Sequence, residues 1–153
     1  MGPWQHKVDE GLDARKTAYE TMYTLLDTCL ARLDLHEFLV RVVAGLSDDS
    51  DEVKVLAHMM LYRLAGVAPT ALAQRLDEIT PPLKKTMEEM KPGKDTVKQD
   101  IERIDELQRS ALRAIAALRR AISPGVSLQF DTFVDIIPRS KWSMEFKELL
   151  SGP

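Results

Sequence analysis

The sequence predicts an all-α protein built from stacked helix pairs. Three observations carry this prediction: apolar residues recur at steps of three and four, no segment alternates apolar with polar residues over strand length, and the helical pattern repeats along the chain. The chain has 153 residues, of which 44% are hydrophobic and 29% charged. That size and composition are typical of a single folded domain, here expected over residues 1–153.

Two helices form the first predicted pair, over residues 11–47. Apolar residues mark one stripe of a helix at about 11–31, and such a stripe must be buried against a neighbour. A second stripe follows at 35–46. Asp34 precedes it as the expected N-cap, because its carboxylate can accept a hydrogen bond from a free amide of the first turn.

The second predicted pair covers residues 50–90. Its first helix begins near Asp51, behind an acidic turn that suits the positive end of a helix dipole. Its second helix opens at Pro69. Pro81 and Pro82 then predict a kink or a break, because neither has a backbone N–H and the second disfavours the helical conformation of the first.

The third predicted pair covers residues 97–138. It begins with the longest helix, of about 25 residues, which the Pro124-Gly125 stop signal ends. A short helix closed by Pro138 follows. A terminal amphipathic helix is expected at about 140–150.

The helical pattern is an internal repeat. A shift of 38 residues lays Asp13 and Lys16 on Asp51 and Lys54, and a less regular third copy follows after a further 55 residues. A period near 40 residues with two helices per unit is typical of a HEAT or armadillo solenoid. The sequence thus predicts a HEAT-repeat α-solenoid of about three helix pairs. The step to the third copy is longer than the first step, which predicts an insertion at about 86–99.

The predicted insertion contains a Pro-Gly pair suited to the centre of a type II turn. Its flanks, 86–90 and 95–99, fit either frayed helix ends or the arms of a short β-hairpin. Its two methionines fit either a core or an adaptable binding surface, and no apolar stripe demands them. The candidate partner-binding residues are Met87, Met90, Lys91, Pro92, Gly93 and Lys94.

The sequence carries no recognisable catalytic or cofactor motif. The closest two of its seven glycines lie nine residues apart, which excludes a Gly-rich phosphate loop. Cys29 and the histidines His6, His36 and His58 lack the paired spacing of a zinc site. We therefore predict no cofactor, no metal and no enzymatic activity. The rival is a helical enzyme whose carboxylate site has no sequence motif.

Net charge and cysteine content limit the classes of binding partner and the cellular compartment that the sequence favours. The formal net charge of −3 gives no support for nucleic-acid binding, and no apolar run is long enough to cross a bilayer. A single cysteine, Cys29, and the absence of Asn fit a reducing, intracellular compartment.

Several segments of the chain resemble the C-terminal domain of the cullin-associated and neddylation-dissociated proteins, also described as TATA-binding-protein-interacting proteins. The resemblance covers roughly residues 1–120 and begins with MGPWQHKVDEGLDARK at 1–16. It continues in AYE at 18–20, MYTLLD at 22–27, LD at 33–34, EFL at 37–39, QRLD at 74–77, VKQ at 97–99, DEL at 105–107 and RSA at 109–111.

The resemblance implies a long HEAT-repeat solenoid that wraps around a cullin bound to its RING partner. In that family a projecting hairpin of the C-terminal repeats occupies the site for the adaptor and substrate receptor. The chain would then be a non-catalytic regulator of cullin–RING ubiquitin ligase assembly that promotes receptor exchange in the cytoplasm and nucleus. The alternative is a HEAT scaffold that binds a transcription factor such as TATA-binding protein, or a transport cargo. Neither alternative involves nucleic acid or a membrane.

Overall fold

The structure, a computed structural model, describes residues 10–89 and 98–152. Within these ranges every regular element is a helix, which confirms the all-α, HEAT-repeat prediction. The α-helices are α1 (Leu12–Thr28), α2 (Leu35–Leu46), α3 (Asp51–Val67), α4 (Pro69–Ala73), α5 (Leu76–Glu89), α6 (Lys98–Ala121), α7 (Leu128–Ile136) and α8 (Ser143–Ser151). Two short 3₁₀ helices, η2 (Leu30–Arg32) and η3 (Ile137–Arg139), complete the set.

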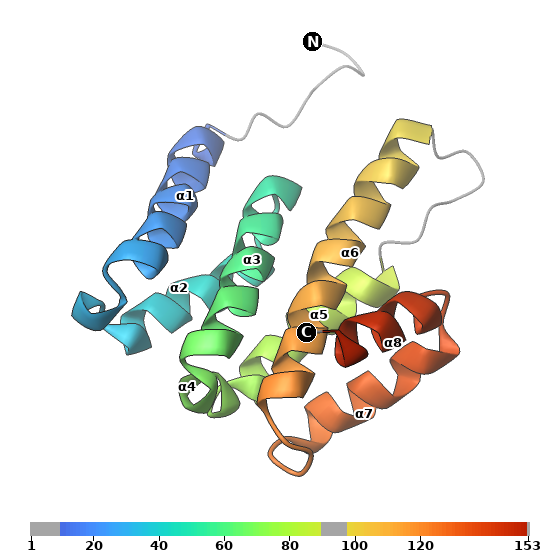
Figure 1. Cartoon of the computed structure of the whole chain (residues 1–153). Helices are drawn as coiled ribbons and strands as arrows, with labels where there is room; N and C mark the ends of the chain where they lie inside the picture. The colour runs from blue at the N-terminus through green and yellow to red at the C-terminus, as the bar shows by residue number, and fades with distance from the viewer. Residues whose placement is uncertain (1–9, 90–97, 153) are drawn as a thin grey trace.

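The helices are arranged in two layers. Figure 1 shows α1, α3 and α6 side by side, and α8 packs against α6. In the second layer α2 packs on α3, and α5 packs on α2, α6 and α7. The apolar sides of both layers meet in one buried core. No helix in the described part of the chain is both long and apolar enough to cross a membrane.

Burial at equivalent repeat positions increases from α1 to α6. Met22 of α1 is only partly buried, whereas its counterparts Met60 of α3 and Ile115 of α6 are fully buried. The reason is that α1 has one neighbour in its layer, α3, while α3 and α6 each have two. The stripe predicted for the first helix is therefore buried only in part: Leu26 is buried but Leu25 is 36% exposed.

Four ion pairs of the first layer join residues that lie 36 positions apart, while a fifth, Arg103–Asp51, joins α6 to α3 across 52 positions. Two connect α1 with α3, one connects α6 with α8, and one connects α6 with Lys141 in the turn before α8. Since exposed ion pairs contribute only about 0–1 kcal/mol each, they help to set the register between helices more than they stabilise the fold. The pairs are Lys16–Glu52, Asp27–Arg63, Asp105–Lys141 and Arg109–Glu145.

The predicted capping of α2 is confirmed, but the helix predicted to open at Pro69 is divided at residues 74–75, between α4 and α5, and not at the prolines. The Asp34 carboxylate accepts a hydrogen bond from the Glu37 amide at 3.2 Å. Helix α5 runs unbroken through Pro81 and Pro82. The two carbonyls that lose their helical partners belong to exposed residues, so water can reach them. The apolar stripe of α5 is fully buried and holds the helix against the core. That stripe consists of Leu76, Ile79 and Leu83.

Ser127 connects the start of α7 to α5. Its hydroxyl accepts a hydrogen bond from the Phe130 amide at 3.1 Å and donates one to the Asp77 carboxylate at 2.5 Å. We expect Ser127→Ala to lower the free energy of unfolding by about 1–2 kcal/mol, because a helix cap and a tether between helices are lost together. Urea denaturation measures the change. Ser123→Ala, at an exposed position in the preceding turn, is the control and should change stability by less than about 0.5 kcal/mol. Equal losses in both variants would contradict the assignment.

Candidate partner-binding site

Of the six predicted partner-binding residues, only Met87 lies within the part of the chain that the structure describes. The other five, at positions 90–94, lie outside it. Met87 is in the last turn of α5, partly buried, and packs against the hydrophobic core. Its position is four residues after Leu83, so it extends the buried stripe of α5 beyond the prolines. Met87 thus has a structural role, and a partner-binding role for it stays a prediction.

The described flanks of the predicted insertion are helical. Residues 86–89 end α5 and residues 98–99 begin α6, so these positions match helix ends rather than β-hairpin arms. A buried amide fastens the end of α5 to α6: Gln108 Nε2 donates to the backbone carbonyls of Thr86 at 3.1 Å and Met87 at 3.3 Å. The last four carbonyls of a helix have no helical partner, so this side chain caps α5 while joining it to α6.

The first part of α6 lies outside the packed core. No residue from 98 to 106 is buried, and burial begins at Leu107. Figure 1 shows this end of α6 extending beyond the ends of α5 and α8. The helix that follows the predicted insertion therefore begins on an accessible arm, where a partner can reach it.

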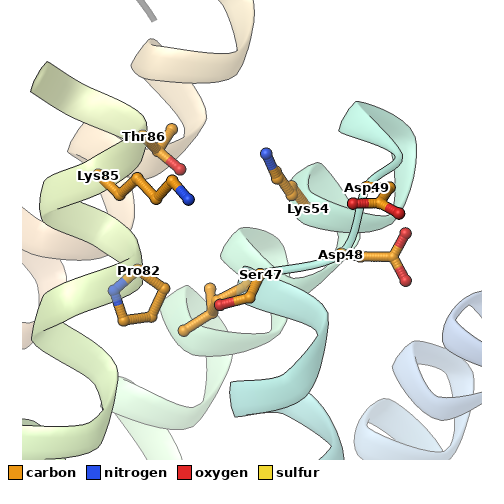
Figure 2. A pocket seen from close by; sticks show the side chains of 8 residues that line it. Ser47, Asp48, Asp49, Lys54, Pro82, Lys85 and Thr86 are labelled. Carbon is orange, nitrogen blue, oxygen red and sulfur yellow. The ribbon is translucent and has the colours of Figure 1, made fainter. Parts of the chain in front are cut away.

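A cleft of about 330 Å³ lies next to the end of α5. Figure 2 shows the amino groups of Lys54, from α3, and Lys85, from α5, extending toward each other across it. The Asp48 and Asp49 carboxylates point away from the two lysines. The cleft is lined by Leu46, Ser47, Asp48, Asp49, Lys54, Pro82, Lys85 and Thr86.

The charge of Asp48 is already compensated within the protein. Its two oxygens accept hydrogen bonds from the Arg15 guanidinium at 3.0 Å each, and Oδ1 also accepts one from the Ser50 amide at 2.9 Å. The two lysines therefore face the centre of the cleft without this carboxylate between them. Lys54 and Lys85 bring two positive charges to the walls of the cleft, and an oppositely charged group would interact favourably with both. The cleft is thus suited to an acidic side chain of a partner.

Sequence reasoning did not identify this lysine pair as a site. Lys54 was visible only as a member of the repeated Asp-x-x-Lys pattern, and Lys85 lay within an ordinary charged segment. The missing information is that α5 packs beside the α2–α3 turn, which is a long-range property.

The described residues offer little that suggests catalysis. No group of three or more His, Cys, Asp and Glu side chains within them is placed to hold a metal ion. Cys29 is partly exposed at the end of α1, and its sulfur lies 3.4 Å from the Thr28 hydroxyl. The Thr28 hydroxyl is not a base that could activate the Cys29 thiol as a nucleophile.

Comparisons with known proteins identify relatives of this chain. The family model described as "TATA-binding protein interacting (TIP20)" matches residues 1–138. The chain is 50% identical over 119 residues to "Cullin-associated NEDD8-dissociated protein 2" of Rattus norvegicus, which covers 77% of the chain and 9% of that protein. It is 39% identical over 152 residues to "Cullin-associated NEDD8-dissociated protein 1" of Dictyostelium discoideum, which covers 99% of the chain and 12% of that protein.

One similar protein has a name that specifies a part of a longer protein. The chain is 35% identical over 121 residues to "Cullin-associated NEDD8-dissociated protein 1, C-terminal part" of Emericella nidulans, which covers 79% of the chain and 11% of that protein. The chain thus spans about a tenth of the length of these relatives.

Proposed function

Since the chain belongs to the TATA-binding protein interacting (TIP20) family, and its relatives are named as cullin-associated proteins, we propose that it is part of a non-catalytic regulator of cullin–RING ubiquitin ligase assembly. In this proposal it binds the N-terminal region of a cullin that carries its RING partner. It competes there with the adaptor and substrate receptor, and so promotes receptor exchange. The observation that carries the proposal is the 50% identity to a cullin-associated protein over 77% of the chain.

The geometry supports a binding role at the α5–α6 connection. The start of α6 is accessible, and the lysine pair of the neighbouring cleft brings two positive charges close to the predicted insertion. The proposed contact residues are Met87, Met90, Lys91, Pro92, Gly93 and Lys94, with Lys54 and Lys85 added. The proposal also includes location in the cytoplasm and nucleus; a fluorescent fusion confined to the secretory pathway would contradict that part.

Competition is tested by titration of an adaptor onto a cullin N-terminal region in the presence of the chain. Two ligands that weaken each other do so by the same factor, so the adaptor must raise the dissociation constant of the chain as much as the chain raises that of the adaptor. A full-length relative should be titrated in parallel, because a long solenoid spreads its contacts over many repeats. Adaptor affinity that neither protein changes refutes the proposal.

Charge reversal tests the lysine pair. We expect the double variant Lys54→Glu and Lys85→Glu to bind the cullin region about tenfold more weakly, because two favourable charge contacts become repulsive. The matched control is Lys147→Glu on exposed α8. Affinity is measured by fluorescence anisotropy at low and moderate salt, since screening should reduce the difference. Equal affinities of the double variant and the control would show that Lys54 and Lys85 are not part of the binding surface.

The second candidate function is binding of TATA-binding protein, which the name of the family favours. The same anisotropy assay distinguishes the two functions when labelled TATA-binding protein replaces the cullin region. Saturable binding of TATA-binding protein without binding of the cullin region would favour this alternative.

A further inference from the structure

A small cavity of about 190 Å³ opens where α1, α3 and α6 meet. It lies on the first layer and is separate from the lysine cleft, with which it shares no residue. Its walls combine exposed Met59 and Tyr62 with buried His58 and Ser110. The six lining residues are Tyr23, His58, Met59, Tyr62, Ser110 and Arg113.

The hydrogen bonds of the buried pair define the state of the His58 ring. The Ser110 hydroxyl donates its one hydrogen to the Leu107 carbonyl at 2.7 Å. It therefore accepts at its 2.8 Å contact with His58 Nδ1, which must carry the ring proton in the neutral imidazole. Burial, with a smaller contribution from the charge of Lys54, lowers the pKa of His58 to about 3, so the ring is neutral near pH 7. His58 Nε2 is then a bare acceptor.

This acceptor is not used within the described part of the chain. His58 Nε2 is buried and has no hydrogen-bond partner there, an uncommon state for a polar atom in a folded protein. It belongs to a residue that lines the cavity, and the outer walls are exposed side chains. Such side chains change rotamer within nanoseconds, so a guest can approach the ring without a backbone rearrangement. A guest that donates a hydrogen bond would satisfy the nitrogen.

We propose that this cavity receives a tyrosine side chain from a protein partner. The Tyr62 and Tyr23 rings and the Met59 side chain offer apolar and aromatic contacts to a phenol ring. The phenol hydroxyl donates to His58 Nε2 and, unlike an indole N–H, can also accept from the Arg113 guanidinium. Lysine and arginine guests are disfavoured, because Arg113 lines the cavity and the charge of Lys54 reaches His58.

The inference deepens the proposed function, on which it rests for the partner, but the chemistry of the cavity is tested without a cullin. The probes are N-acetyl-tyrosinamide and N-acetyl-phenylalaninamide, which differ in the hydroxyl group. They are titrated onto the whole chain while its aromatic and histidine side-chain resonances are followed by NMR. We expect the tyrosine probe to shift the His58, Tyr23 and Tyr62 resonances and to bind about tenfold more tightly, because the phenylalanine probe leaves Nε2 unpaired.

The variant His58→Phe keeps a flat ring but lacks the acceptor, and we expect it to bind both probes equally. His36→Phe, the same substitution at an exposed position of α2, should keep the tenfold preference. The comparison of the two probes on the wild-type chain needs no variant, so a variant that fails to fold does not prevent the test. Equal binding of both probes to the wild-type chain, or shifts confined to residues outside the cavity, would overturn the proposal. If the chain binds the cullin region but does not prefer the tyrosine probe, the proposal for the cavity fails while the proposed function stands.

Discussion

The chain should lose about 4 kcal/mol more stability than its His58→Phe variant when the pH falls from 7 to 3. Burial lowers the pKa of His58 from 6.5 to about 3 in the folded state, whereas the unfolded chain takes up the proton near pH 6.5. Between these values the unfolded state binds more protons. The stability that neutral His58 provides is therefore complete above pH 6.5 and is lost as the pH falls toward 3, by about 1.4 kcal/mol per pH unit.

Urea denaturation at half-unit pH intervals measures this difference. At pH 7 the two proteins should have similar stability, since phenylalanine fills the site and removes an acceptor without a partner. Leu128→Ala, an exposed substitution that changes no titratable group, serves as the control, and its stability should follow that of the wild-type chain over the whole range. Parallel stability curves for the wild-type chain and His58→Phe would show that His58 is protonated as readily in the folded protein as in the unfolded chain.

Leu64→Ala should lower the free energy of unfolding by about 3 kcal/mol and the melting temperature by roughly 6–12 °C. Leu64 is fully buried in α3, the helix that packs against α1, α2 and α6. Removal of its side chain loses apolar burial and leaves a cavity that three surrounding helices cannot easily close. Chemical and thermal denaturation followed by circular dichroism measure both quantities.

Leu128→Ala is the matched control for this substitution. Leu128 is in the first turn of α7 and is 82% exposed, so the same change should alter stability by less than about 0.5 kcal/mol. A loss for Leu64→Ala as small as that of Leu128→Ala would mean that α3 is not at the centre of the core.

The helices were predictable because each depends on a local pattern. The stripes of α2, α3 and α6 predicted their positions within a few residues, and Asp34 marked a start by a contact three residues away. The unbroken α5 was not predictable in this way. There the local cost of Pro81 and Pro82 is outweighed by burial of the stripe around them, which depends on the neighbouring helices.

The sites depend even more on distant residues. The lysine pair of the cleft is formed by residues 54 and 85, and the buried histidine pair by residues 58 and 110. No periodicity connects such positions, so the sequence identifies His58 only as a histidine without the spacing of a zinc site. The predicted burial of α1 is too high for a related reason. An apolar stripe shows which face of a helix can be buried, but the number of neighbouring helices decides how much of that face is covered.

The Gln108 amide has a further consequence for how this protein can diversify. Because it holds the end of α5 from a position deep in α6, the geometry of that end depends on a residue remote from the segment that follows. Substitutions in the intervening residues should therefore leave the end of α5 in place as long as Gln108 is kept. An engineer could use the same property to graft foreign recognition loops onto this scaffold.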